Sequence, residues 1–99
     1  MRIRVMPEFC STGLWDLDHK NMMIDFEELK IPKDLIQEIE KWIDDYDFNY
    51  DLDKNYMKDA NLMNEEGMKI ARKLKYIFPD IYIEYKGENN DGLMESIII

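Results

Sequence analysis

Alternating apolar and polar residues near both ends of the chain predict β-strands. In residues 2–6 (RIRVM), Ile3 and Val5 alternate with arginines, which is the period of two expected of a half-buried strand. Residues 81–86 (IYIEYK) alternate in the same way, and residues 94–99 (MESIII) are apolar and branched after the turn-forming sequence GENNDG. These patterns predict three strands, near residues 2–6, 81–86 and 94–99, with the last two antiparallel.

Apolar residues spaced three or four apart predict two amphipathic helices between these strands. Pro32 suits the start of a helix near residues 33–46, whose apolar stripe consists of Ile31, Leu35, Ile39, Trp42, Ile43 and Tyr46. Asn64 is the expected N-cap of a second helix near residues 65–78, whose apolar side consists of Met68, Ala71, Leu74 and Phe78. Each stripe is expected to pack against the sheet.

Residues 7–31 show no sustained period and are expected to form a long ordered loop. Its expected regular structure is a short strand near residues 22–24 or a helical turn near residues 26–29, and Trp15 is expected to anchor it. The order strand, loop, helix, helix, strand, strand over residues 1–99 predicts a single α+β domain. Its two layers would be a small sheet and the two helices that cover one face of it.

Composition identifies a globular protein and limits its partners. Of the 99 residues, 45% are hydrophobic, which is enough for one ordinary core. Lysine and arginine total 13 against 22 aspartates and glutamates, a net charge of -9 that repels phosphate backbones and anionic membranes. Neither nucleic acid nor a membrane is therefore an expected partner. The charged amino terminus does not resemble a signal peptide, which predicts a cytoplasmic location.

Cys10 and His19 are the only cysteine and histidine of the chain. A single thiol cannot form an internal disulfide, and without a second histidine or a plausible cysteine partner, zinc sites and catalytic triads would need unusual constructions. Both residues are interpreted as bystanders, and no cofactor is expected.

The acidic stretch WIDDYDFNYDLDKNYMKD contains a partial calcium-loop pattern. Asp51, Asp53 and Asn55 have the spacing of calcium ligands, but Tyr56 and Leu62 stand where the loop needs a glycine and a bidentate glutamate. The turn and the strongest ligand are both missing. We therefore expect no metal site.

The same stretch belongs to a concentrated negative patch. From residue 34 to residue 53 the chain carries one base, Lys41, and eight acids: Asp34, Glu38, Glu40, Asp44, Asp45, Asp47, Asp51 and Asp53. Aspartates at the end of a helix oppose its macrodipole, so helix stability does not explain them. Two interpretations remain open, a solvated acidic face and a surface that docks a cationic protein. Acid-base catalysis is not expected, because no nucleophile or buried carboxylate pair is indicated.

For a docking surface, tyrosines would add flat contact area at low entropic cost. The candidate partner-binding residues are therefore Asp44, Asp45, Tyr46, Asp47, Tyr50, Asp51 and Asp53, together with Trp15 and Asp16 from the long loop.

Three segments of the chain resemble a known family. The runs RIRVMPEFCSTGLWDLD, IDFEELKIPKDLIQEIEKWIDDYD and EEGMKIARKLKYIFPDIYIEY look like small acidic bacterial immunity proteins of polymorphic toxin and contact-dependent growth inhibition systems. The likeness lies in an opening strand, a loop with Trp15 and Asp16, a first helix with Trp42, a second helix with Gly67 and a closing strand.

This resemblance implies a cytoplasmic antidote that binds one cognate toxin domain. The toxin would be cationic and commonly a nuclease, and the aspartates would occupy its phosphate-binding cleft as phosphate surrogates. We expect the antidote to be a monomer or a weak homodimer. The second hypothesis is a generic acidic adaptor or structural subunit without a toxin partner, and a small hydrolase ranks third.

Overall fold

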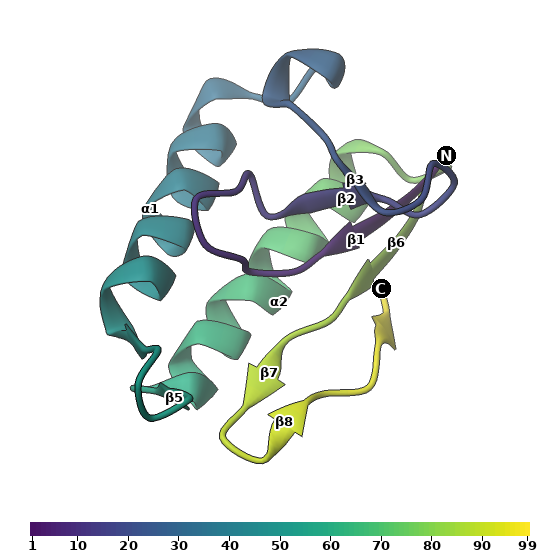
Figure 1. Cartoon of the computed structure of the whole chain (residues 1–99). Coiled ribbons are helices and arrows are strands. Elements are labelled where there is room, and N and C mark those ends of the chain that lie inside the picture. Colours follow the sequence, from purple (N-terminus) through teal and green to yellow (C-terminus); the bar gives the residue numbers. More distant parts are fainter.

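The computed structural model describes residues 1–99 and contains a five-stranded mixed sheet with two long helices on one face (Figure 1). The strand order is β3-β2-β1-β6-β9, in which β1 (Arg2–Val5) and β6 (Tyr82–Tyr85) are the parallel central pair. The outer strands are β2 (Leu14–Asp16), β3 (Met22–Met23) and β9 (Ile97–Ile98). The predicted α+β class, with two helices over one sheet, is confirmed.

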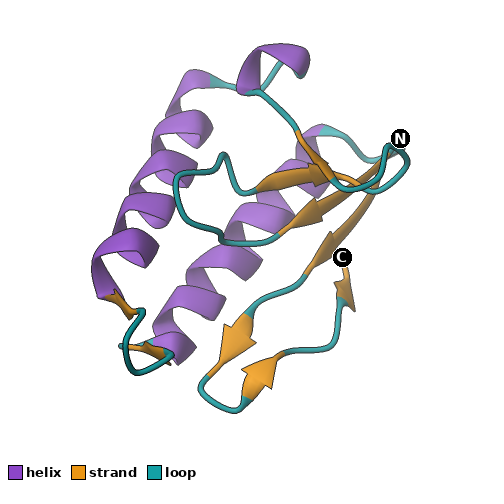
Figure 2. Ribbon diagram, viewed as in Figure 1, coloured by secondary structure: helices purple, strands orange, loops and turns teal.

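The helices are α1 (Lys33–Asn49) and α2 (Ala60–Ile77), which run antiparallel beside each other, with α2 packed directly on β1 and β6. Two small strand pairs lie apart from the main sheet (Figure 2). One is β4 (Tyr50–Asp51) with β5 (Tyr56–Met57), between the helices, and the other is β7 (Glu88–Asn89) with β8 (Gly92–Leu93). Neither helix is long and apolar enough to cross a membrane.

The strand alternation places an apolar face of the sheet under the helices. Ile3, Val5, Ile83 and Tyr85 are completely buried, and the parallel register pairs Ile3 with Ile83 and Val5 with Tyr85. The strands expected near residues 2–6 and 81–86 are confirmed. The third expected strand is much shorter than residues 94–99, because residues 88–93 form their own hairpin before β9 pairs with β6.

The segment 7–31 contains more regular structure than expected. Both suggested elements are present, as β3 and as a short 3-10 helix (Phe26–Glu28), but β2 was not expected. β2 has only three residues, which is too short to show a period of two. It exists because it pairs antiparallel with β1, with Val5 opposite Leu14.

α1 continues for three residues beyond the predicted end at residue 46. The side-chain amide of Asn49 donates to the carbonyl of Asp45 at 2.8 Å, and the N–H of Tyr50 bonds to the carbonyl of Tyr46. These bonds satisfy carbonyls that a helix end otherwise leaves unpaired. The helix therefore extends into the acidic stretch despite its unfavourable aspartates.

Asn64 does not cap the second helix, which was a wrong prediction. α2 begins at Ala60, a full turn earlier, with Asp59 in a left-handed conformation at the cap position. The Asn64 side chain instead accepts from the Tyr85 hydroxyl at 2.7 Å and donates to the Glu88 carbonyl at 3.1 Å. Although asparagine is common at helix caps, Asn64 thus bonds to residues that are distant in sequence.

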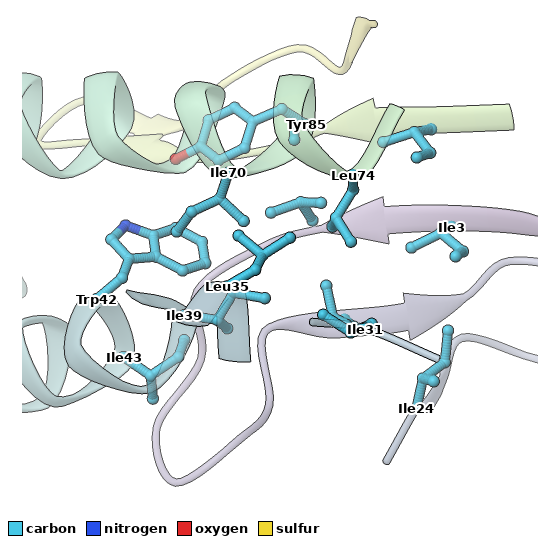
Figure 3. Packing of buried hydrophobic residues seen from close by; sticks show 14 of the residues in the cluster. Ile3, Ile24, Ile31, Leu35, Ile39, Trp42, Ile43, Ile70, Leu74 and Tyr85 are labelled. Carbon is cyan, nitrogen blue, oxygen red and sulfur yellow. The ribbon is translucent and has the colours of Figure 1, made fainter. Parts of the chain in front are cut away.

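The predicted apolar stripe is buried: Leu35, Ile39, Trp42, Ile43 and Tyr46 lie on α1, and Ile31 precedes it. On α2 the buried residues are Met63, Gly67, Ile70, Ala71 and Leu74, whereas Met68 and Phe78 are only partly buried. Figure 3 shows Trp42 reaching from α1 toward α2 and Tyr85. Its indole N–H donates to the Met63 carbonyl at 2.9 Å, so this large side chain is both packed and hydrogen-bonded.

We predict that Trp42→Ala lowers the free energy of unfolding by about 3–5 kcal/mol, because it leaves a large cavity and removes the hydrogen bond to the Met63 carbonyl. Chemical denaturation would measure the loss. Trp42→Phe is the control, since it keeps an aromatic ring and removes the hydrogen bond, and it should cost less. Unchanged stability of Trp42→Ala would contradict the packing described here.

We also predict that Gly67→Ala is destabilising, although alanine is the better helix former. A Cβ at residue 67 would lie 2.7 Å from Cζ2 of Trp42 and closer still to the Tyr85 ring. Overpacking of this kind costs about 1–3 kcal/mol. Thermal unfolding would show it as a lower Tm, while Lys69→Ala, at an exposed position of α2, should leave Tm nearly unchanged.

Candidate partner-binding surface

The predicted acidic stretch forms one end of the molecule, where α1 stops and the β4–β5 hairpin follows (Figure 1). We name this surface the acidic face and define it by Asp44, Asp45, Asp47, Phe48, Asp51, Leu52 and Asp53. Its α1 half carries Asp44 to Phe48 and its hairpin half carries Asp51 to Asp53. The structure therefore places the five predicted aspartates of this stretch at one end of the molecule, but their side chains have different environments.

Three of the five aspartates have partners within the chain. Asp45 forms an ion pair with Lys41 at 2.8 Å. Asp47 accepts from the backbone N–H of Cys10 at 3.4 Å, while its other oxygen is buried without a partner. The Asp51 side chain accepts from the N–H groups of Asp53 and Lys54 at 3.0 and 3.3 Å, which stabilises the hairpin turn.

Asp44 and Asp53 are exposed and have neither an ion-pair nor a side-chain hydrogen-bond partner. Exposed like charges repel one another and do not stabilise the fold. These two carboxylates are therefore the aspartates of the acidic face that make no stabilising contact within the chain.

Tyr46 and Tyr50 occupy the base of the acidic face. Tyr46 is only 3% exposed, and its ring packs against Phe9 and Tyr50 with centroids 5.1 and 5.6 Å away. Its hydroxyl donates to Glu88 at 2.6 Å; burial and this bond raise the pKa of Tyr46 above its ordinary value. Tyr46 thus cannot offer contact area on the surface of the chain alone, and Tyr50 is half-buried.

Phe48 and Leu52 supply the exposed apolar area that the tyrosines do not. Phe48 is 89% exposed and Leu52 is 68% exposed, so both side chains stand in solvent among the aspartates. Neither residue is among the partner-binding residues predicted from the sequence. The exposure of Phe48 was predictable from the sequence, because it lies two residues after Tyr46 and hence on the side of the helix opposite the apolar stripe.

Trp15 and Asp16 lie on β2, within the main sheet and away from the acidic face (Figure 1). The Trp15 ring N–H donates to the Met6 carbonyl at 3.0 Å, and the side chain is half-buried. Asp16 contacts the His19 ring at 2.8 Å; although burial opposes it, this contact lowers the pKa of Asp16. The structure does not join these two residues to the other candidates.

Trp15 belongs to the sheet face that the helices leave open. The register places one row across this face, from Met23 through Trp15, Arg4 and Glu84 to Ile98. Arg4 and Glu84 form an ion pair at 2.8 Å at its centre. Burial would raise the pKa of Glu84, but hydrogen bonds from Arg4, Ser96 and Tyr82 hold it below its ordinary value.

The hollow between the two helices does not bring the acidic residues together. It measures about 360 Å³ and is lined by Glu38, Lys41, Trp42, Glu66, Lys69, Ile70 and Lys73. Two of its lysines are paired, Lys41 with Asp45 and Lys73 with Glu38. No three His, Cys, Asp or Glu side chains of the chain gather closely enough to hold a metal ion.

Comparison with known proteins gives one family. A family model described as "Serratia CdiI immunity protein-like" matches residues 1–87. The matched residues include both helices, the acidic face and the central strands, and the match ends just before β7. No curated protein matches the chain.

Near the acidic face, Glu8 is exposed, yet partial loss of water around its carboxyl and the charge of Glu88 raise its pKa. A raised carboxyl pKa means that folding favours the protonated form, so the stabilising contribution is present at acid pH and is lost as pH rises through the folded pKa. We predict that Glu8→Gln raises Tm at pH 7 and makes no difference at about pH 3, below the ordinary glutamate pKa. Glu95→Gln, at an exposed position of the tail, is the matched control; an equal effect of both changes at pH 7 would contradict the explanation.

Proposed function

The chain belongs to the Serratia CdiI immunity protein-like family, a family of toxin-neutralising proteins of contact-dependent growth inhibition, and we propose that it binds its cognate toxin through the acidic face. The observation that supports this proposal is that the acidic face carries two aspartates without a partner in the chain, Asp44 and Asp53, beside two exposed apolar side chains, Phe48 and Leu52. These four side chains, two charged and two apolar, make no stabilising contact that the fold requires.

This combination has the properties of a protein interface. Energetically dominant contacts are commonly aromatic side chains that enter a pocket of the partner and are surrounded by polar groups. Phe48 is suited to that role because its ring is 89% exposed before binding and a partner would remove it from water. Unpaired carboxylates around it would attract a cationic partner and increase the association rate.

We infer that the toxin domain is cationic. The chain has a net charge of -9, so long-range attraction favours a positively charged partner and repels an acidic one. A nuclease fits this description, because it grips phosphates with basic side chains. In that case Asp44 and Asp53 would occupy the places of phosphate groups, and nucleic acid would be excluded from the cleft.

This function requires binding and not catalysis of a reaction by the chain itself. Where the toxin is a nuclease, its substrate is cytoplasmic nucleic acid, and we propose that the chain acts in the cytoplasm. Asp45, Asp47 and Asp51 have a different role in this proposal: their hydrogen bonds and ion pair shape the acidic face, and the two unpaired aspartates make the contacts.

We predict that the double variant Asp44→Asn, Asp53→Asn keeps the Tm of the parent and binds the toxin more slowly. The association rate at low salt should fall by about tenfold or more, and the difference should shrink at high salt, where charges are screened. The partner in this experiment is the product of the reading frame adjacent to that of this chain, tested as the cognate toxin, and binding rates and protection of cells that produce it would be measured together.

A second pair of variants tests the apolar contact. Phe48→Ala should weaken binding by about 2 kcal/mol or more if Phe48 is a dominant contact. Tyr76→Ala is the matched control, because Tyr76 is also an aromatic residue with 89% exposure but lies on α2 outside the acidic face. Unchanged binding and protection in both the Asp44 and Asp53 variant and Phe48→Ala would place the interface elsewhere, with the Trp15 face the next candidate.

A further inference from the structure

The β4–β5 hairpin, which supplies half of the acidic face, has little means of supporting itself. Each of its strands has only two residues, Tyr50–Asp51 and Tyr56–Met57. An isolated two-stranded hairpin is marginally stable in water even when longer. Its tip, from Leu52 to Tyr56, is exposed and has no apolar packing. A fixed position for Asp53 and Leu52 must therefore come from contacts outside the hairpin.

One such contact comes from Asn90, in the turn of the β7–β8 hairpin. The Asn90 side-chain oxygen accepts from the Met57 N–H at 2.8 Å, and its side-chain nitrogen donates to the Met57 carbonyl at 3.3 Å. A single amide group thus satisfies both backbone groups of a β5 residue, as a third strand would. The Met57 side chain is only 2% exposed. The strand β5 is therefore fixed both by the hydrogen bonds of Asn90 to its backbone and by burial of this side chain in the core.

The turn that carries Asn90 is itself well defined. The Asn89 side chain accepts from the Asp91 N–H at 2.9 Å, an arrangement that stabilises turns. Gly92 has a φ of +126°, which residues with a side chain rarely adopt. The Met94 N–H bonds to the Gly87 carbonyl at 3.0 Å beyond the hairpin. The side chain of Asn90 therefore projects from a fixed turn.

The same segment is tied to both helices. Glu88 accepts from the Tyr46 hydroxyl of α1 at 2.6 Å through its side chain and from Asn64 of α2 at 3.1 Å through its backbone carbonyl. Residues 88–90 consequently contact the end of α1, the first turns of α2 and β5, which are the three elements around the acidic face. These residues lie outside the family match of residues 1–87.

We propose that Asn90 is a positioning residue for toxin binding: it holds the β4–β5 hairpin in the orientation in which Asp53 and Leu52 meet the toxin. This inference rests on the proposed function of the acidic face. Loss of Asn90 would leave the charges of the face unchanged and increase the number of hairpin conformations. Binding then requires the hairpin to be ordered again, which lowers affinity.

The test compares Asn90→Ala with the parent in the full-length chain, using amide hydrogen exchange and toxin binding. The reporters are the N–H groups of Asp53, Lys54 and Lys58, which bond to Asp51 and to the Asn49 carbonyl within the hairpin region. Their exchange should become faster by on the order of tenfold, as expected for the loss of two hydrogen bonds. The N–H of Met6, which follows β1 and bonds to the Gly13 carbonyl, should exchange as in the parent.

Toxin affinity of Asn90→Ala should fall by a similar factor of about ten, with the salt dependence of the parent, because no charge has been removed. Asn90→Asp should give an intermediate or equal loss, since it keeps an acceptor for the Met57 N–H and removes the donor to the carbonyl. Asn61→Ala, an exposed asparagine in the first turn of α2, should change neither exchange nor affinity.

Three results would overturn the positioning role. Unchanged exchange and unchanged affinity would show that Asn90 does not order the hairpin. Unchanged exchange with weaker binding would show that Asn90 contacts the toxin directly. Faster exchange with unchanged affinity would show that hairpin order does not matter for binding. If the Asp44 and Asp53 variant also bound normally in the same assay, the acidic face would not be the interface and the proposed function would fail as well. If that variant bound more weakly, only the positioning role of Asn90 would fail.

Discussion

The close contact of Gly67 with Trp42 and Tyr85 sets the arrangement of the whole domain. Only a hydrogen atom on Gly67 leaves room for the two rings, whose centroids are 6.3 Å apart. Trp42 comes from α1, Gly67 from α2 and Tyr85 from β6, so one contact fixes both helices relative to the sheet. The Trp42 hydrogen bond to Met63 sets the position of α2 along α1 as well. A larger residue at position 67 would separate layers that share one small core.

A chain of polar contacts leads from this contact to the acidic face. The Tyr85 hydroxyl donates to Asn64, Asn64 donates to the carbonyl of Glu88, and the Glu88 carboxylate accepts from Tyr46. Each of these partners is remote in sequence from the next. Most buried polar groups in folded proteins are paired, and these bonds specify how the C-terminal segment lies against the helices. The base of the acidic face is therefore continuous with the core, whereas its rim is solvated.

The acidic stretch combines structural and interaction roles that charge counting does not separate. Asp47 and Asp51 accept from backbone N–H groups and so define the shape of a loop and a turn. Asp44 and Asp53 have no such bonds, and their repulsion is a cost that the fold alone does not require. Surfaces used for binding commonly retain features of this kind, because the partner supplies the compensating charge.

The sequence by itself determined the elements whose pattern is long enough to read. The stripe from Leu35 to Tyr46 and the alternation of Ile3 with Val5 predicted α1 and β1, since burial of one face imposes a period of 3.6 or 2. Tertiary structure alone decided the short elements. β2 and the strands of the β4–β5 hairpin have two or three residues each, and only pairing with another strand makes such short segments regular. Tertiary structure also decided the contacts of individual polar residues. The sequence predicts Asn64 as a helix cap and Tyr46 as a surface contact, yet both side chains bond to Glu88 in the C-terminal segment. Folding brings these residues together, and no local sequence pattern encodes that proximity.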